Sequence, residues 1–185
     1  MTQGKRLVFF QDESHLLWQD ACGYVWGRTD SRIEVPMTNE KKRQTYYGVL
    51  NVLTGEVLLE PFAKADGEQT VAFLKKLQNR FPTQQLVLFW DGATYHKYGL
   101  TRDYLKELNQ GLAEDDWRIT CCILAPYAPE QSPVEDVWLW GKRWVQEHYH
   151  QCQSFADVKR LFVEAIDGHV FNFNKLQKYL CSQPI

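Results

Sequence analysis

The feature that most limits the fold of this chain is a run of five apolar residues that ends directly in an acid. The run is Leu86 to Trp90, and Asp91 and Gly92 follow it. An uninterrupted apolar run of this length is typical of a strand that is buried on both faces, because a half-exposed strand alternates apolar and polar residues instead. Such a strand lies at the centre of a covered sheet. The run therefore predicts a central buried strand with Asp91 at its carboxyl end.

The segments around this run supply the other elements of such a sheet. Further strands are predicted at Leu7 to Phe10, Tyr24 to Trp26, Thr45 to Leu53, Glu56 to Phe62 and Trp117 to Leu124, with a hairpin turn at Thr54-Gly55. Helices are predicted from the N-cap Asp66 to Pro82, over Thr101 to Leu112, from Ser132 or Pro133 to about His148, and after the N-cap Ser154. An early hairpin followed by alternating strands and helices predicts an α/β fold, a mixed sheet flanked by helices. We expect residues 1–185 to form a single domain.

Composition and charge limit the class of protein. The chain carries a formal net charge of −2, whereas dedicated nucleic-acid binders usually have a basic excess. Its cysteines are five in number and form no C-x-x-C pair, which argues against a disulfide framework and a zinc knuckle. No apolar run reaches the ~18 residues of a membrane span, and Leu7 to Phe10 is too short for a signal peptide. We therefore expect a cytoplasmic protein with reduced thiols and no membrane association.

Three acidic residues lie at boundaries of the predicted elements. Asp12 follows the first strand, Asp91 follows the central strand, and Glu135 lies in the first turn of a helix that follows a proline-rich loop. Active sites of open α/β sheets form outside the carboxyl ends of the strands. Two Asp side chains there, joined by a Glu from a nearby helix, could hold hard divalent cations through oxygen. Two such ions ~4 Å apart can clamp the attacking and leaving oxygens of a phosphodiester.

Each of these acids also has a purely structural interpretation. Asp12 could cap a turn, and Asp91 begins an Asp-Gly pair that is common in turns. Ser132 to Glu135 has the form of a capping box, with Pro133 at the first helical position. The metal-site hypothesis therefore depends on the three acids together and on the segments that contain them.

These segments resemble the acidic motifs of insertion-sequence and mariner-type transposases of the DDE superfamily. Phe9 to Ser14 (FFQDES) is similar to their first motif, and Leu88 to Lys97 (LFWDGATYHK) is similar to their second, usually a strand, then Asp-Asn-Ala and a His-Lys pair. Leu124 to Trp138 (LAPYAPEQSPVEDVW) is similar to their third, which in relatives reads Pro-Tyr-Ser-Pro-Glu-Leu-Asn-Pro-Ile-Glu and a Trp. The resemblance spans nearly the whole chain, from Leu7 to about Phe162, and the third motif is long and specific.

The resemblance implies an RNase H-like fold and a metal-dependent polynucleotidyl transferase. It implies that Asp12, Asp91 and Glu135 bind two Mg²⁺ or Mn²⁺ ions, and that water cleaves a DNA strand before strand transfer, as in DNA transposition. The chain departs from relatives at Gly92 and Ser132, where they often carry Asn, and in a longer stretch between the second and third motifs. None of these departures removes a ligand.

The resemblance also implies partners. Such transposases carry helix-turn-helix modules before the first Asp, and only eleven residues precede Asp12 here. We therefore expect a nucleoid-associated catalytic domain that acts on transposon-end and target DNA with a separate helix-turn-helix segment or protein, as a homodimer that pairs two ends. The alternatives are an inactive or truncated remnant that serves in binding or assembly, and a structure-selective nuclease of the same fold that cuts without joining.

Basic side chains near the motifs are candidate DNA contacts. His96 and Lys97 follow the second motif and could lie near a phosphate or the leaving strand, with a polar loop as the alternative. Lys142 and Arg143 could contact phosphates without reading sequence, with a solvated helix face as the alternative. For Trp138 we expect a core position rather than base stacking.

Overall fold

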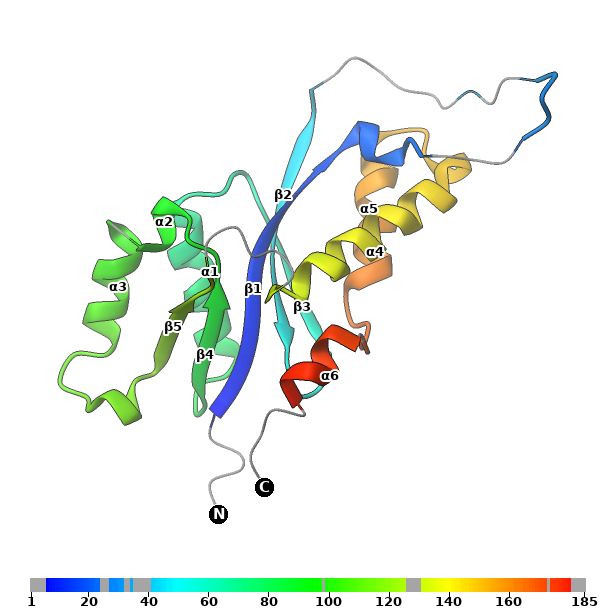
Figure 1. Ribbon diagram of the computed structural model, residues 1–185. Helices are drawn as coiled ribbons and strands as arrows, with labels where there is room; N and C mark the ends of the chain where they lie inside the picture. Colours follow the sequence, from blue (N-terminus) through cyan, green and yellow to red (C-terminus); the bar gives the residue numbers. More distant parts are fainter. Residues whose placement is uncertain are drawn as a thin grey trace.

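A five-stranded sheet forms the centre of the molecule, with helices on both of its faces (Figure 1). The computed structural model describes residues 6–23, 27–31, 34, 41–97, 99–125, 131–172 and 174–180. The strands are β1 Arg6–Leu17, β2 Arg43–Asn51, β3 Val57–Phe62, β4 Gln85–Trp90 and β5 Ile119–Ile123, in the order β3-β2-β1-β4-β5. The helices are α1 Gly67–Arg80, α2 Thr94–Lys97, α3 Leu100–Leu108, α4 Val134–Glu147, α5 Phe155–Ile166 and α6 Asn174–Leu180, with 3-10 turns at Trp18–Ala21, Glu114–Asp116 and Tyr149–Gln151.

Strand β1 is where the sheet changes from antiparallel to parallel pairing. On one side it pairs antiparallel with β2, which pairs antiparallel with β3. On the other side it pairs parallel with β4, which pairs parallel with β5. The turn between β2 and β3 contains Gly55, whose φ of 73° lies in the left-handed region that favours glycine. The predicted mixed sheet with an early hairpin is therefore confirmed.

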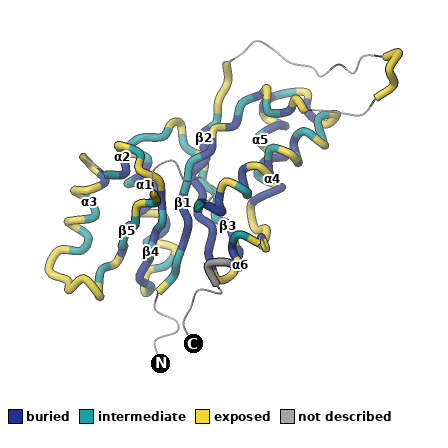
Figure 2. Tube along the Cα trace, viewed as in Figure 1, coloured by how far each residue is buried: buried dark blue, intermediate teal, exposed yellow. Residues whose placement is uncertain are grey.

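Alternate residues of the strands face two separate hydrophobic cores. Phe9 and Tyr47 pack with α1 and α3, whereas their neighbours Phe10 and Tyr46 pack with α4 and α5. Burial is concentrated along the strands, and exposure along the outer sides of the helices (Figure 2). The two cores hold the sheet between two helical layers, as expected for an α/β fold.

The central apolar run is buried on one face and partly exposed on the other. Leu86, Leu88 and Trp90 are each no more than 1% exposed and belong to the core under α1 and α3. Val87 and Phe89, on the opposite face, are only partly buried, because α4 and α5 pack over β1, β2 and β3 instead. The prediction of a buried central strand is thus correct for one face only.

Side-chain caps begin two helices as predicted, and a third helix begins differently. Asp66 accepts a hydrogen bond from the Gln69 amide and caps α1, and Ser154 with Asp157 forms a capping box at α5. The N-cap of α4 falls on Pro133, so the predicted capping box with Ser132 in that position does not form. Glu135 still lies in the first turn of α4, as predicted.

Other differences concern the ends and number of the elements. β1 continues seven residues beyond its predicted end at Phe10, because pairing with β2 extends to Leu17. α2 and α6 were not predicted, and the strand predicted at Tyr24 to Trp26 lies outside the described residues. Within the described ranges, no helix combines the length and apolar character needed to cross a membrane.

Candidate active site

Asp12 and Asp91 lie side by side on neighbouring strands. β1 and β4 pair in parallel with Phe10 opposite Phe89, and each acid lies two residues beyond this pair. β4 ends at Trp90, so Asp91 follows the strand as predicted. Asp12 differs from the prediction because it lies within β1 rather than after it. Parallel pairing in this register brings both carboxylates to the same edge of the β1–β4 pair.

Asp12 is a partly buried carboxyl with a specific hydrogen-bond donor. The indole Nε1 of Trp138 donates to Asp12 Oδ2 at 2.9 Å. Burial raises the pKa of Asp12 to about 7; the charges of Glu13 and Asp91 add to this effect, and the Trp138 hydrogen bond opposes it. An ionised carboxylate in this place is costly, so a bound cation would stabilise it.

A glycine opposite Asp12 makes room for the Trp138 indole. Asp12 pairs with Gly48 across β1 and β2. A Cβ atom on Gly48 would lie 2.3 Å from Cη2 of Trp138, which is closer than non-bonded carbons approach. The absence of a side chain at Gly48 therefore makes room for the six-membered ring of the indole, whose Nε1 reaches Asp12.

Trp138 also brings the third acid towards this edge. Glu135 precedes Trp138 by three residues on α4, a spacing that places both on neighbouring positions of one helix face. Glu135 itself is exposed. Among the residues that the structure describes, no three His, Cys, Asp or Glu side chains gather closely enough to hold one metal ion. The structure thus brings Asp12 and Asp91 together, and Glu135 lies one turn before the tryptophan that contacts Asp12.

Asp91 has the opposite environment to Asp12. Its side chain is 60% exposed, and its Oδ1 accepts hydrogen bonds at 2.9 Å from both the Ala93 amide and His96 Nδ1. The hydrogen bond from His96 lowers the pKa of Asp91 and outweighs the effect of partial burial. Asp91 is therefore a charged, water-accessible carboxylate whose orientation is set by its neighbours.

His96 lies between two carboxylates. Nδ1 contacts Asp91 Oδ1 at 2.9 Å, and Nε2 contacts Glu13 Oε1 at 3.1 Å. The ring stacks on Trp90 with centroids 4.4 Å apart and planes parallel. Burial lowers the pKa of His96, but the hydrogen bonds and charges of Asp91 and Glu13 outweigh burial and raise that pKa to about 9.

The four basic side chains predicted to contact DNA have different environments. The His96 side chain is 1% exposed and both ring nitrogens have partners, so the structure places it with Asp91 instead of at a surface that a phosphate can reach. Lys97 is partly buried, and its Nζ lies close to Gly92, the residue after Asp91. An added Cβ on Gly92 would lie 2.8 Å from this Nζ. Lys142 donates to the His15 carbonyl at 3.2 Å.

Arg143 is the remaining member of this group. It is exposed on α4, two turns beyond Glu135. Because the guanidinium is in water and lies on the helix that carries Glu135, it is well placed for a phosphate contact of the kind that orients DNA.

Sequence reasoning did not identify Glu13, Gly48 or the polar role of Trp138. Glu13 is adjacent to Asp12, so in a strand it points to the opposite face, where α2 brings His96. Trp138 follows Glu135 at a one-turn spacing, which was a usable signal. The partners of Glu13 and Trp138 lie 83 and 126 residues away along the chain, so no local pattern indicates them.

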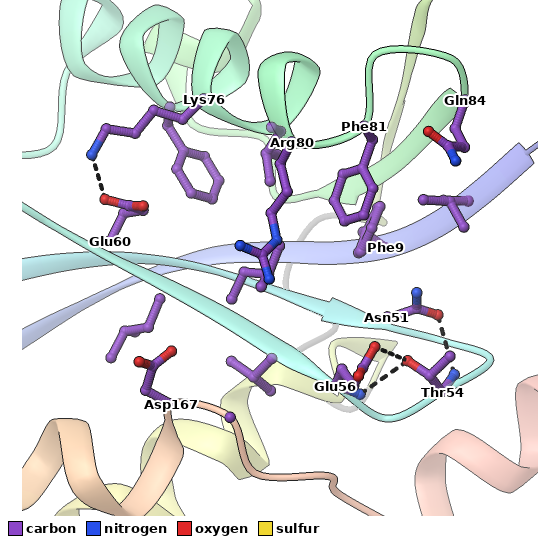
Figure 3. Close-up of a pocket in the computed structure, with 17 residues that line it drawn as sticks. Phe9, Asn51, Thr54, Glu56, Glu60, Lys76, Arg80, Phe81, Gln84 and Asp167 are labelled. Atoms are coloured by element: carbon purple, nitrogen blue, oxygen red, sulfur yellow. Dashed lines mark hydrogen bonds and ion pairs between the residues drawn. The ribbon is translucent and has the colours of Figure 1, made fainter.

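A pocket of about 680 Å³ lies apart from these acids. It opens between α1 and β3 and has an apolar floor that includes Phe9 and Phe81. Figure 3 shows Lys76 paired with Glu60 at its rim and Arg80 extending from α1 over the strands. None of Asp12, Asp91 and Glu135 lines it. The cavity is therefore separate from the candidate active site.

Comparisons with solved structures match this fold. A chain of the simian T-cell lymphotropic virus intasome in complex with PP2A regulatory subunit B56 gamma has a TM-score of 0.59 at 10% identity, covering 96% of this chain and 54% of that chain. The Mos1 transposase paired-end complex with left transposon end gives 0.56 at 16%, covering 92% and 50%. The catalytic core domain of BIV integrase gives 0.51 at 17%, covering 95% and 94%. The predicted RNase H-like fold is confirmed, and the chain spans about half the length of the first two matched chains.

The sequence matches the profile of a known family, although a search of individual curated proteins finds no match. The family profile described as DDE superfamily endonuclease matches residues 7–157, a range that contains Asp12, Asp91 and Glu135. Because this range is well over half of the chain, the protein belongs to the DDE superfamily of endonucleases.

Proposed function

We propose that this chain is the catalytic domain of a transposase, which cleaves DNA strands and joins the resulting 3′-hydroxyl ends to target DNA. The observation that carries the proposal is the placement of Asp12 beside Asp91, with Trp138 linking Asp12 to the helix that bears Glu135. Family membership and the likeness to a transposase and an integrase core support it.

The residues present fit divalent cations. DDE superfamily endonucleases generally use such metals. We propose that Asp12, Asp91 and Glu135 would hold two Mg²⁺ or Mn²⁺ ions. Mg²⁺ usually takes one or two carboxylates and completes its shell with water and phosphate oxygens, so the neighbouring Asp12 and Asp91 carboxylates suit its ligand preference. When bound, such ions stabilise the oxygens of the phosphodiester that gain charge.

The protein side chains supply orientation and charge around the scissile phosphate. Trp138 keeps the Asp12 carboxyl turned towards α4, and His96 with the Ala93 amide occupies Asp91 Oδ1 of a side chain that is 60% exposed. Lys97, next to Asp91, is the side chain that we place near the leaving strand. Positioning of this kind is the main protein contribution when the metals perform the charge stabilisation.

DNA contacts on the chain are few, so partners are part of the proposal. We propose that Arg143, Lys142 and Lys97 contact backbone phosphates, and that a separate helix-turn-helix segment or protein recognises the transposon ends. Pairing of two ends by a homodimer is supported by the likeness to the Mos1 paired-end complex, of which this chain spans half of one chain. The net charge of −2 is consistent with specific DNA binding elsewhere.

A cleavage and joining assay tests this function. Purified full-length chain is incubated with supercoiled plasmid, Mn²⁺ and a labelled oligonucleotide with a free 3′-hydroxyl, and nicking and joining are measured separately. D12N, D91N and E135Q should each lower both rates about a hundredfold or more, because each removes metal-dependent charge stabilisation of several kcal/mol. D103N, on the exposed face of α3, is the matched control and should leave both unchanged.

The pattern of results separates the alternatives. Nicking without joining would identify a nuclease that cuts only. Equal activity in the parent chain, D12N and D91N would contradict the proposed site.

A further inference from the structure

His96 is buried at the point where α2 meets the edge of the sheet. Its side chain is 1% exposed, and the Glu13 side chain that faces it is 5% exposed. The ring is held from one side by the parallel stack on Trp90 and from another by an edge contact with Tyr95, with centroids 4.6 Å apart. The imidazole therefore has one orientation, fixed by packing as well as by its two carboxylate contacts.

Glu13 is held as firmly as the ring. Its Oε1 accepts from Gln11 Nε2 at 2.9 Å, and its Oε2 accepts from the Tyr95 hydroxyl at 3.1 Å. Oε1 also faces His96 Nε2 at 3.1 Å. A buried carboxylate with three partners of this kind costs free energy unless all are made, and such networks specify one arrangement of side chains.

Asp91 is the exposed end of this chain of contacts. It follows the last residue of β4, and its side chain is 60% exposed, so packing alone does not hold it. Both of its hydrogen bonds are made by Oδ1, whereas Oδ2 accepts none from the residues that the structure describes. The hydrogen bond from His96 thus turns one oxygen inward and leaves the other towards solvent.

We infer that His96, anchored by Glu13, is a positioning residue that holds the Asp91 carboxylate in the orientation needed to bind a divalent metal ion. This inference rests on the proposed function, because it takes Asp91 as a metal ligand. Residues that orient metal ligands typically change metal affinity by 10–100-fold when they are replaced, although they do not touch the metal.

The two ring nitrogens allow a test with two uncharged amide variants that differ by one methylene. In H96N the amide nitrogen lies as many bonds from the backbone as Nδ1 and can still donate to Asp91. In H96Q the amide nitrogen corresponds to Nε2 and reaches Glu13 instead. Both variants lose the stacked ring, and H96N leaves the larger void, so a role in packing alone predicts the greater loss in H96N. A positioning role predicts the greater loss in H96Q, because only H96Q loses the Asp91 contact.

The readout is Mn²⁺ affinity of the full chain, measured by titration calorimetry without DNA, with the melting temperature recorded for each variant. We expect H96Q to bind Mn²⁺ about thirtyfold or more weakly, and H96N, which loses the Glu13 contact but keeps the Asp91 contact, to bind about threefold to tenfold more weakly than the parent. D103N, on the exposed face of α3, should stay within about twofold. Equal affinities in H96N and H96Q would overturn the inference.

A second variant covers the case in which either His96 variant fails to fold. E13Q keeps the size of the side chain but replaces a charge-assisted contact to the ring with a weaker one, and we expect Mn²⁺ binding about threefold to tenfold weaker. Unchanged affinity in E13Q would overturn the inference. D91A distinguishes failure of the proposed metal site from failure of the positioning role of His96. If the parent binds Mn²⁺ no better than D91A, the proposed metal site is wrong and the inference fails with it.

Discussion

At the residue scale, Asp12 and Asp91 occupy opposite environments, although each lies two residues beyond the paired Phe10 and Phe89. Asp12 is partly buried beneath Trp138, and burial raises its pKa to about 7. Asp91 is exposed, and the hydrogen bond from His96 lowers its pKa. Asp12 therefore destabilises the metal-free protein when ionised, whereas Asp91 does not, and bound cations would relieve the cost at Asp12.

The first prediction concerns the stability of D12N across pH. The pKa of Asp12 rises from 3.8 to about 7 on folding, so the folded state favours the protonated carboxyl. The contribution of Asp12 to the free energy of unfolding has its full value below pH 3.8 and is lost as pH rises from there through about 7. In EDTA at pH 8, D12N should be more stable than the parent chain by up to about 4 kcal/mol, since each pKa unit corresponds to about 1.4 kcal/mol.

Urea unfolding at pH 4.5 and pH 8 measures this difference. The difference in unfolding free energy between D12N and the parent should be smaller at the lower pH, where the parent carboxyl is protonated in the folded state. An equal difference in unfolding free energy at both pH values, or a D12N chain that is less stable than the parent at pH 8, would show that burial does not raise the pKa of Asp12.

The second prediction concerns the glycine beneath the indole. In G48A the new Cβ would lie 2.3 Å from Trp138 Cη2, so the indole must shift, at a cost of about 1–3 kcal/mol in unfolding free energy. G67A is the matched control, because its Cβ would meet Leu100 Cβ at an ordinary 3.8 Å and should be neutral or slightly stabilising. Equal unfolding free energies for the two variants would contradict this account of Gly48.

At the element scale, the site depends on how α4 lies against β1. Trp138 contacts Asp12 on β1, and Lys142 of the same helix donates to the His15 carbonyl further along that strand. Gly141 lies between these two residues on α4, and an added Cβ there would come within 2.5 Å of Ile166 on α5. Close packing on both sides of α4 therefore fixes the position of its first turn, which carries Glu135.

The third prediction tests the contact between helix and strand. W138F keeps an aromatic ring but removes the indole N–H, which leaves the buried Asp12 oxygen without its donor. We expect Mn²⁺-dependent nicking to fall about tenfold or more in a chain that remains folded by circular dichroism. W140F, on the exposed side of the same helix, should keep the parent rate; a matching loss in W140F would mean that the effect is not specific to Asp12.

The sequence predicted those elements whose patterns are local. The apolar run before Asp91 identified β4, and Ser154 identified the start of α5. The course of β1 through Asp12 was not predictable, because Gln11 and Ser14 are polar and owe their burial to pairing with β2. The contact between Glu13 and His96 joins residues 83 positions apart, so it exists only in the folded chain.

At the scale of the whole molecule, charge and size bear on the proposal that other segments supply most of the DNA binding. The chain carries a net charge of −2 and spans about half of the matched Mos1 transposase chain. Its candidate phosphate contacts are confined to the region of α2 and α4. Affinity for DNA is therefore expected to be weak and to come from a small number of ion contacts.

The fourth prediction follows from this charge distribution. In a plot of log affinity for a DNA duplex against log salt concentration, measured by fluorescence anisotropy, each phosphate contact adds about 0.9 to the slope. R143Q and K97Q should each make the slope less steep by about 0.9, the contribution of one phosphate contact. K159Q, whose Nζ lies over the Phe155 ring on α5, is the control; an unchanged slope in R143Q and K97Q would remove these two residues from the DNA surface.

The most direct test of the central claim is the location of bound metal. Crystals of the full chain grown with Mn²⁺ are measured for anomalous scattering. We expect peaks about 2 Å from carboxylate oxygens of Asp12 and Asp91, with Glu135 beside them. Mn²⁺ bound only at sites that exclude Asp12 and Asp91, or no Mn²⁺ at these acids at saturating concentration, would contradict the proposed metal site.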